Sequence, residues 1–170
     1  MRLFIAIELS EPMKDALIDL QNRWYDGGVR GSYSPEENLH LTLAFIGEAP
    51  DGEPAREALS DLRFTPFELC LEGAGRFGDL WWAGLRPSPP LDALARRVRH
   101  ALAEGGVPFD RKRFSPHITL LRKARGELSD CELTGPAMTV EAFSLYRSDR
   151  GRNAMIYTEL ARFRAGEAPP

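Results

Sequence analysis

The chain has 170 residues, of which 43% are hydrophobic and 28% are charged. This length suits one compact domain or two small lobes that share a core. A formal net charge of −3 excludes the polycation class of proteins, which hold nucleic acid by bulk charge alone. The chain contains no apolar run near the roughly 20 residues of a membrane span. Cys70 and Cys131 lack metal-type spacing, so we expect free thiols and a cytoplasmic protein.

The first 45 residues predict a strand, a helix and a second strand. Residues 2–9, "RLFIAIEL", form an apolar run typical of a strand. The glycines of residues 26–31, "DGGVRG", are suited to end a helix before the strand "NLHLTLAF" at residues 38–45. A loop is expected between the two. Four apolar side chains keep the 4-3-4 spacing of one helix face: Met13, Leu17, Leu20 and Trp24.

The second half of the chain predicts the same three elements. Residues 80–85, "LWWAGL", predict a strand, and residues 115–122, "SPHITLLR", predict another. The segment "EGGVP", residues 104–108, is suited to end the helix between them. The buried face of that helix is predicted from Leu91, Leu94, Val98, Ala101 and Leu102.

Further elements flank these units. A short helix is predicted near residues 54–62, followed by a strand over residues 64–75. Strands are also predicted over residues 138–148 and 153–163. We interpret residues 1–164 as a single two-lobed domain and residues 165–170 as a frayed C-terminal tail.

The two halves match when the sequence is displaced by 77 residues, the separation of His40 and His117. The match extends without a gap over about 40 residues, and it includes "DAL" at residues 15–17 and again at residues 92–94. A repeat of this length indicates an internal duplication. The predicted fold class is α+β, with two pseudo-twofold-related lobes. Each lobe would be a small antiparallel sheet backed by helices, with an active-site cleft between the lobes.

Each repeated strand carries a histidine and, two residues later, a threonine. Because side chains alternate along a strand, His40 and Thr42 share one face, as do His117 and Thr119, while the apolar residues share the other. Two imidazoles that face one cleft are suited to acid and base catalysis, since both protonation states are accessible near an ordinary pKa of about 6.5.

Two other interpretations of the histidines are weaker. A metal site would need a third histidine or a carboxylate at ligand spacing, and the sequence offers neither. A purely structural duplication would bury unpaired imidazoles in a core, which is costly. We therefore expect neither a metal nor a cofactor.

Basic and aromatic residues surround the second motif. Arg122 lies five residues after His117, so it reaches the cleft face only if the strand ends or bulges near Leu121; its counterpart in the first repeat is Phe45. The segment 111–125 holds six basic residues and no acidic one, and it is either a surface that binds a chain of phosphates or a solvated loop. The candidate contacts to a nucleic-acid strand are Arg111, Lys112 and Arg113, and Tyr33, Phe45 and Phe114 are candidates to stack on a terminal base.

The motifs "HLTL" and "HITL" resemble those of the 2H phosphoesterase superfamily. The longer segments "RLFIAIEL", "NLHLTLAFIGE" and "FSPHITLLR" resemble its branch of RNA 2',3'-cyclic phosphodiesterases, also called 2'-5' RNA ligase-like proteins. The resemblance extends from residue 2 to about residue 164.

The resemblance implies metal-independent opening of a 2',3'-cyclic phosphate at an RNA 3' end to a 2'-phosphate, with reversible 2'-5' ligation as a related reaction. His40 would be the proton donor and His117 the proton acceptor, with Thr42, Thr119 and Arg122 binding the phosphate. The partner would be RNA with a 2',3'-cyclic phosphate terminus, and tRNA halves are among the candidates. The protein would be a monomer and would not associate with a membrane. The alternatives are a phosphodiesterase for a small nucleotide or ADP-ribose cyclic phosphate, and an inactive RNA-binding module.

Overall fold

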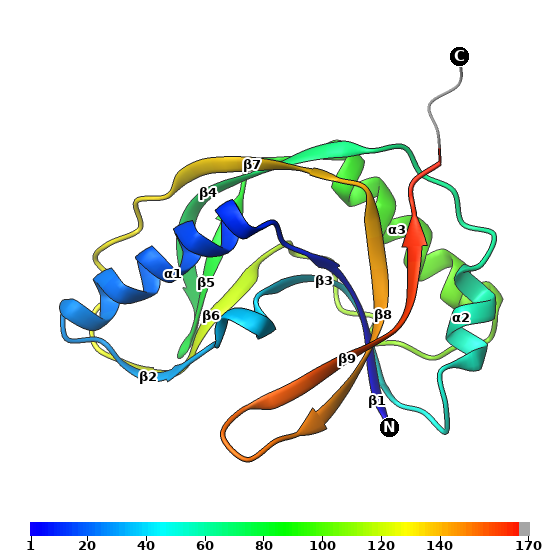
Figure 1. The fold of residues 1–170 in the computed structure, drawn as a ribbon, viewed down its shortest axis with the longest axis horizontal. Helices are drawn as coiled ribbons and strands as arrows, with labels where there is room; N and C mark the ends of the chain where they lie inside the picture. The colour runs from blue at the N-terminus through cyan, green and yellow to red at the C-terminus, as the bar shows by residue number, and fades with distance from the viewer. Residues whose placement is uncertain (167–170) are drawn as a thin grey trace.

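A computed structural model describes residues 1–166 of the chain, which form two antiparallel sheets and three α-helices (Figure 1). No helix in this part of the chain is both long and apolar enough to cross a membrane. The elements in chain order are β1 (Arg2–Glu8), α1 (Glu11–Asp26), β2 (Arg30–Tyr33), a 3-10 turn η1 (Glu36–Asn38), β3 (His40–Glu48), α2 (Glu53–Leu59), β4 (Phe67–Phe77), β5 (Leu80–Leu85), α3 (Pro89–Glu104), β6 (Ile118–Arg125), β7 (Thr134–Val140), β8 (Ala142–Arg150) and β9 (Met155–Arg164).

The two sheets repeat one strand order. The first sheet has the order β3-β1-β8-β9, and the second has the order β2-β6-β5-β4-β7. The repeated strands β1 and β5 are central in their sheets, and each pairs with its own motif strand, β3 or β6. β2 is the additional strand at the edge of the second sheet. The α+β class with two antiparallel lobes is therefore confirmed.

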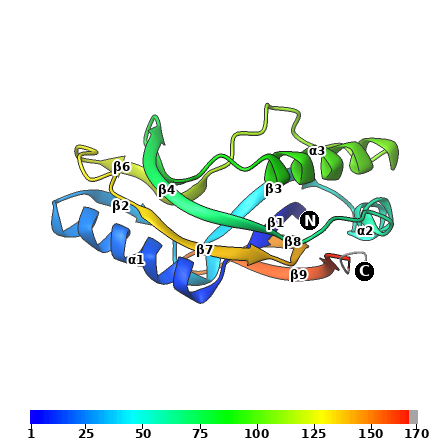
Figure 2. The ribbon, with the colours of Figure 1, turned by 90° about the horizontal axis from the view of Figure 1, so that it is seen from above.

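Each long helix packs against the sheet of the other lobe. α1 follows β1 of the first sheet but contacts β6 and β7 of the second, and the Trp24 ring meets Trp81 of β5 edge-on with centroids 5.2 Å apart. α3 follows β5 of the second sheet but contacts β3 of the first sheet and α2, in addition to β4 of its own sheet. Figures 1 and 2 show α1 and α3 at opposite ends of the molecule. This exchange interlocks the lobes, because neither sheet is covered without a helix from the other half.

The local sequence accounts for both helices. The Ser10 hydroxyl accepts from the Met13 amide at 3.4 Å, and the Ser88 hydroxyl accepts from the Leu91 amide at 3.3 Å, so each helix begins with a side-chain cap. A proline occupies the first turn of each, and Gly27 or Gly105 ends it. The predicted apolar faces are buried, including Leu17, Leu20, Leu94 and Val98.

Three predicted elements differ from the structure. The strand predicted over residues 138–148 is two strands, because the chain leaves the second sheet at Glu141 and enters the first. The predicted loop before the first motif contains β2, whose Tyr33 pairs with Leu121. Gly31 allows this pairing, since a Cβ there would lie 2.8 Å from the Arg122 carbonyl oxygen. The short helix α2 ends at Leu59, before the predicted residue 62.

The predicted tail is only partly described. The Ala165 amide donates to the Glu141 carbonyl at 2.7 Å, and the Gly166 amide donates to the Phe64 carbonyl at 2.9 Å. Residues 167–170 lie outside the described residues. The frayed tail therefore stays a prediction.

One hydrophobic core joins both sheets and all three helices. The apolar side of each motif strand belongs to it: Leu41 and Leu43 from β3, and Ile118 and Leu120 from β6, have no exposed surface. The polar side of each strand is left for the cleft between the sheets.

Candidate active site

The two motif strands lie side by side where the sheets meet (Figure 1). Their polar faces line one cleft with a volume of about 510 Å³. The cleft brings together the residues predicted for catalysis and phosphate binding: His40, Thr42, His117, Thr119 and Arg122.

A β-bulge in each motif strand sets which later side chain enters the cleft. Thr119 pairs with Trp82 and Leu121 pairs with Trp81, so Leu120 is the extra residue of β6. In β3 the first extra residue is Leu43, because its neighbours at 42 and 44 pair with consecutive residues of β1, and Ile46 is a second extra residue further along. Each bulge reverses the alternation that follows it. Arg122 and Phe45 are thereby returned to the cleft face, and both line the cleft.

A helix side chain satisfies the carbonyl of each bulged residue. The Gln21 side-chain amide on α1 donates to the carbonyls of Leu120 and Ser34, both at 3.0 Å. Arg99 on α3 donates from Nε to the Leu43 carbonyl at 3.2 Å. The Leu120 carbonyl also accepts from the Ser34 amide at 2.9 Å, so Gln21 adds a second hydrogen bond there. Each exchanged helix therefore contacts one bulge through a polar side chain.

Backbone carbonyls orient both imidazoles in the same way. Nδ1 of His40 lies 2.6 Å from the Asn38 carbonyl oxygen, and Nδ1 of His117 lies 2.7 Å from the Ser115 carbonyl oxygen. A carbonyl only accepts, so Nδ1 carries the hydrogen in both rings. Nε2 is then the atom that can exchange a proton with a ligand. In the neutral state of His40, Nε2 accepts from the Thr42 hydroxyl at 2.9 Å.

The two imidazoles differ in their surroundings. The His40 ring packs against Phe4 and Tyr157, with centroids 4.9 and 5.2 Å apart. Burial lowers the pKa of His40 to about 4; the Asn38 carbonyl opposes this shift, and the charges of Arg122 and His117 add to it. His117 meets only Phe77 among the described rings, edge-on at 5.2 Å. Without a bound anion, His40 is therefore neutral at pH 7.

The remaining predicted residues fall in different places. Phe45, with 50% of its surface exposed, and Tyr33 line the cleft, and the Tyr33 hydroxyl donates to the Val29 carbonyl at 2.9 Å. Phe114 packs against the hydrophobic core and beneath Arg99. The exposed segment 111–113 lies in the loop between α3 and β6 and is absent from the residues that line the cleft.

Several residues of the site escaped sequence reasoning. Gln21 interrupts the apolar face of α1 at a position where a polar side chain needs a partner, which is a signal that could have marked it. Arg2, Arg150 and Arg152 also line the cleft. They lie far from both motifs in the sequence, and only the strand pairing brings them there.

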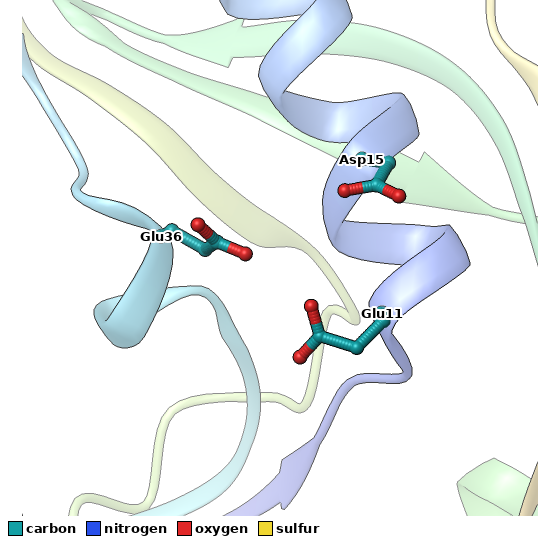
Figure 3. Close-up of side chains that lie close together, drawn as sticks. All are labelled: Glu11, Asp15 and Glu36. Carbon is teal, nitrogen blue, oxygen red and sulfur yellow. The ribbon is translucent and has the colours of Figure 1, made fainter.

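A cluster of carboxylates lies outside the cleft. Glu11 and Asp15 of α1 approach Glu36 of η1, with ligand atoms within 4.8 Å of one another (Figure 3). All three side chains are exposed, and none of them lines the cleft. Exposed carboxylates alone do not define a metal site, so metal-independent catalysis stays a prediction.

Comparison with known proteins agrees with the geometry. The family model of the 2'-5' RNA ligase superfamily matches residues 11–152. The chain is 34% identical over 172 residues to an RNA 2',3'-cyclic phosphodiesterase of Escherichia coli (strain K12), with 95% of each chain covered. It is 31% identical to an RNA 2',3'-cyclic phosphodiesterase of Geobacillus stearothermophilus, where the match covers 98% of this chain and 58% of that protein.

A solved structure extends the likeness to the whole fold. The structure of E. coli LigT complexed with 3'-AMP superposes with a TM-score of 0.85 and 32% sequence identity, and the match covers 98% of both chains. The duplicated fold, the paired motifs and these matches show that the chain belongs to the 2'-5' RNA ligase superfamily.

Proposed function

We propose that the protein hydrolyses 2',3'-cyclic phosphates at RNA 3' ends and leaves a 2'-phosphate. The observation that carries this proposal is the pair of imidazoles, both oriented through Nδ1, in one cleft with two threonine hydroxyls. Relatives named RNA 2',3'-cyclic phosphodiesterase, at about this level of identity, support the same reaction. The complex of E. coli LigT with 3'-AMP supports a nucleotide as ligand.

The reaction needs one base and one acid. Nε2 of His117 takes a proton from a water molecule as its oxygen attacks the phosphorus. The bond from phosphorus to O3' breaks, and Nε2 of protonated His40 gives its proton to O3'. The 2'-phosphate ester remains. Each positioned proton transfer supplies roughly 10²- to 10⁴-fold in rate.

The hydroxyls and the arginine hold the phosphate. Thr119 and Thr42 are suited to donate to the non-bridging oxygens, since a hydroxyl is both donor and acceptor. The Thr42 hydroxyl donates to neutral His40 in the unliganded protein. Once His40 is protonated at Nε2, that hydroxyl is released to donate to the phosphate. Arg122 supplies a permanent positive charge.

The low pKa of His40 bears directly on its role as the acid. The pKa of about 4 arises from burial, with the charges of Arg122 and His117 acting in the same direction. A phosphate monoanion bound beside these groups opposes both charges and raises the pKa. His40 therefore takes up its proton together with the substrate.

The same chemistry supports ligation. An RNA 5'-hydroxyl in place of water would give a 2'-5' linkage with no change of catalytic group. A smaller alternative substrate is a nucleotide or ADP-ribose cyclic phosphate. It would use the same two histidines and two threonines, and it would leave more of the cleft unoccupied than an RNA. Three expectations stay predictions. They are that the protein is a cytoplasmic monomer, that it acts on tRNA halves, and that residues 1–164 form a single domain.

The decisive experiment uses an RNA that ends in a 2',3'-cyclic phosphate, incubated with the protein and excess EDTA. The expected product carries its phosphate on the 2' oxygen. A 3'-phosphate product would contradict protonation of O3', and no turnover of this RNA either with or without EDTA would refute the proposal.

A further inference from the structure

Arginines extend along the cleft well beyond the two motifs. Arg2, Arg150 and Arg152 line it together with Arg122, and none of its described lining residues carries a carboxylate. Within residues 1–166, these four guanidinium groups make neither a hydrogen bond nor an ion pair with another residue. In contrast, nearby Arg147 pairs with Asp149 at 2.8 Å. The cleft therefore presents unpaired cationic donors that a bound anion can use.

Arg2 lies away from the histidines, while Arg150 and Arg152 belong to a hairpin whose Met155 carbonyl accepts from the Asn38 side chain at 2.9 Å. Arg2 pairs with Ser148 near the end of β8, while Glu8, six residues along β1, pairs with His40. Six residues of strand span roughly 20 Å. Arg150 ends β8, and Arg152 follows in the turn to β9. Figure 1 shows this hairpin projecting beyond the rest of the first sheet.

The chemistry of the substrate fixes what can reach these arginines. A cyclic phosphate between His40 and His117 is the 3' end of the RNA, so every other phosphate of the strand lies on its 5' side. Guanidinium groups match phosphate oxygens in geometry and charge. A span of roughly 20 Å accommodates several nucleotides, since one strand of a helix advances about 3.4 Å per phosphate.

We propose that Arg2, Arg150 and Arg152 bind the phosphodiester backbone on the 5' side of the terminal nucleotide, so that the enzyme prefers oligonucleotides over cyclic mononucleotides. This inference rests on the proposed function and specifies its substrate. It differs from the prediction that the segment 111–113 holds the RNA, because that segment lies outside the residues that line the cleft.

The test compares three double variants with equal loss of charge. Arg150→Gln with Arg152→Gln alters the hairpin, and Arg111→Gln with Lys112→Gln alters the predicted segment. Arg96→Gln with Arg97→Gln is the control, because both side chains are exposed on α3 and absent from the cleft lining. Each protein is assayed on adenosine 2',3'-cyclic phosphate and on an RNA of about ten nucleotides with the same terminus.

The hairpin variant is expected to lose at least about tenfold more kcat/KM on the oligonucleotide than on the mononucleotide, mainly through KM. The slope of log(1/KM) against log salt should fall in magnitude by roughly 1.4, because each single-strand phosphate contact contributes about 0.7. The control variant should keep both the wild-type ratio and the wild-type slope.

Other outcomes overturn the inference. Equal losses on both substrates would place the hairpin arginines in the chemistry or the fold, and a selective loss confined to the variant at residues 111 and 112 would place the RNA on the other flank. If the wild type opens no cyclic phosphate, the proposed function fails separately. Fluorescence anisotropy with RNA ending in a 3'-phosphate then tests the surface alone, and unchanged affinity of the hairpin variant would refute it.

Discussion

The side-chain amide of Gln21 donates a hydrogen bond to the carbonyl of Leu120, 99 residues later in the chain, at 3.0 Å. This contact joins the helix exchange to the active site, because Leu120 is the bulged residue that turns Arg122 into the cleft. Arg99 makes the matching contact with Leu43 in the other lobe. Each exchanged helix thus donates a side-chain hydrogen bond to one bulge, and the Ser34 amide supplies a second bond to Leu120.

Replacing Gln21 by leucine should therefore weaken both stability and phosphate binding. Two hydrogen bonds would be lost, although the Leu120 carbonyl keeps its bond from the Ser34 amide. The loss should cost about 1–3 kcal/mol of unfolding free energy, and KM should rise as Arg122 moves. Asn22→Leu, an exposed change on the same helix, is the control for urea unfolding and kinetics. If Gln21 acts through Arg122, then Arg122→Gln should cost less in the Gln21→Leu background than in the wild type; additive losses would contradict this.

The interlocked lobes should unfold together. Trp24→Ala removes the α1 ring that meets Trp81 of β5 and should cost about 3–5 kcal/mol. Phe143→Ala, in the core of the other lobe, should shift the same single transition. Urea unfolding followed by far-UV circular dichroism and by tryptophan fluorescence should give coincident curves for each variant. Two separated transitions would show that the lobes unfold independently.

Sequence patterns predicted what depends on local periodicity. The period of 3.6 marked the buried faces of α1 and α3, and alternation placed His40 with Thr42 on a polar face. These patterns identify the apolar face of an element but not the element that packs against it. The packing of each long helix on the other lobe's sheet could therefore not be predicted. β2 contains Gly31 and Ser32 and has no apolar alternation, and it is placed by backbone pairing with β6 and by the packing of Tyr33 against the core.

The site shows the same limit. The 77-residue repeat identified both motifs, because duplicated side chains are visible without coordinates. Whether Arg122 enters the cleft depended on a bulge, which backbone register decides and composition does not. Arg150 and Arg152 reach the cleft only because the chain passes from β7 of the second sheet to β8 of the first at Glu141. Long-range pairing of this kind leaves no local signal.

Acid should destabilise the protein partly through His40. Its pKa is about 4 in the folded protein, chiefly through burial, against about 6.5 in the unfolded chain. Above pH 6.5 both states are neutral at this residue, and as pH falls from 6.5 to 4 only the unfolded state gains the proton. Wild-type stability should therefore fall across this window by up to about 3 kcal/mol more than that of His40→Gln.

Urea unfolding at several pH values between 7 and 4 measures this difference. His100→Gln is the matched control, since His100 is exposed on α3, and its curve should follow that of the wild type. Parallel curves for the wild type and His40→Gln would contradict a lowered pKa at His40.

Chelation should leave hydrolysis unchanged. The proposed mechanism moves protons only between water, two imidazoles and O3', and it holds the phosphate by hydroxyls and a guanidinium group. Initial rates on a cyclic phosphate should therefore be equal with and without excess EDTA. A loss that added Mg²⁺, Mn²⁺ or Zn²⁺ restores would show that a metal takes part.

The last prediction separates the roles of the two histidines. His40→Ala removes the acid that protonates the leaving oxygen, so a nitrophenyl phosphodiester, whose leaving group needs no proton, should recover much of the rate. His117→Ala removes the base that activates water, and the same substrate should recover far less. With the wild type, the rate should be bell-shaped in pH, with limbs that belong to the pair of imidazoles.

The pKa of about 4 at His40 also fits the opposite assignment, in which His40 is the base and His117 is the acid, since a neutral imidazole can accept a proton directly. Rates of both alanine variants on a cyclic phosphate and on the nitrophenyl diester decide between the two assignments. If the nitrophenyl diester rescues His117→Ala but not His40→Ala, then His117 is the proton donor and His40 is the proton acceptor. Full activity of either variant on the cyclic phosphate would remove that histidine from the reaction. Rescue of His40→Ala alone would leave His40 as the acid, with the bound phosphate anion holding its proton in place.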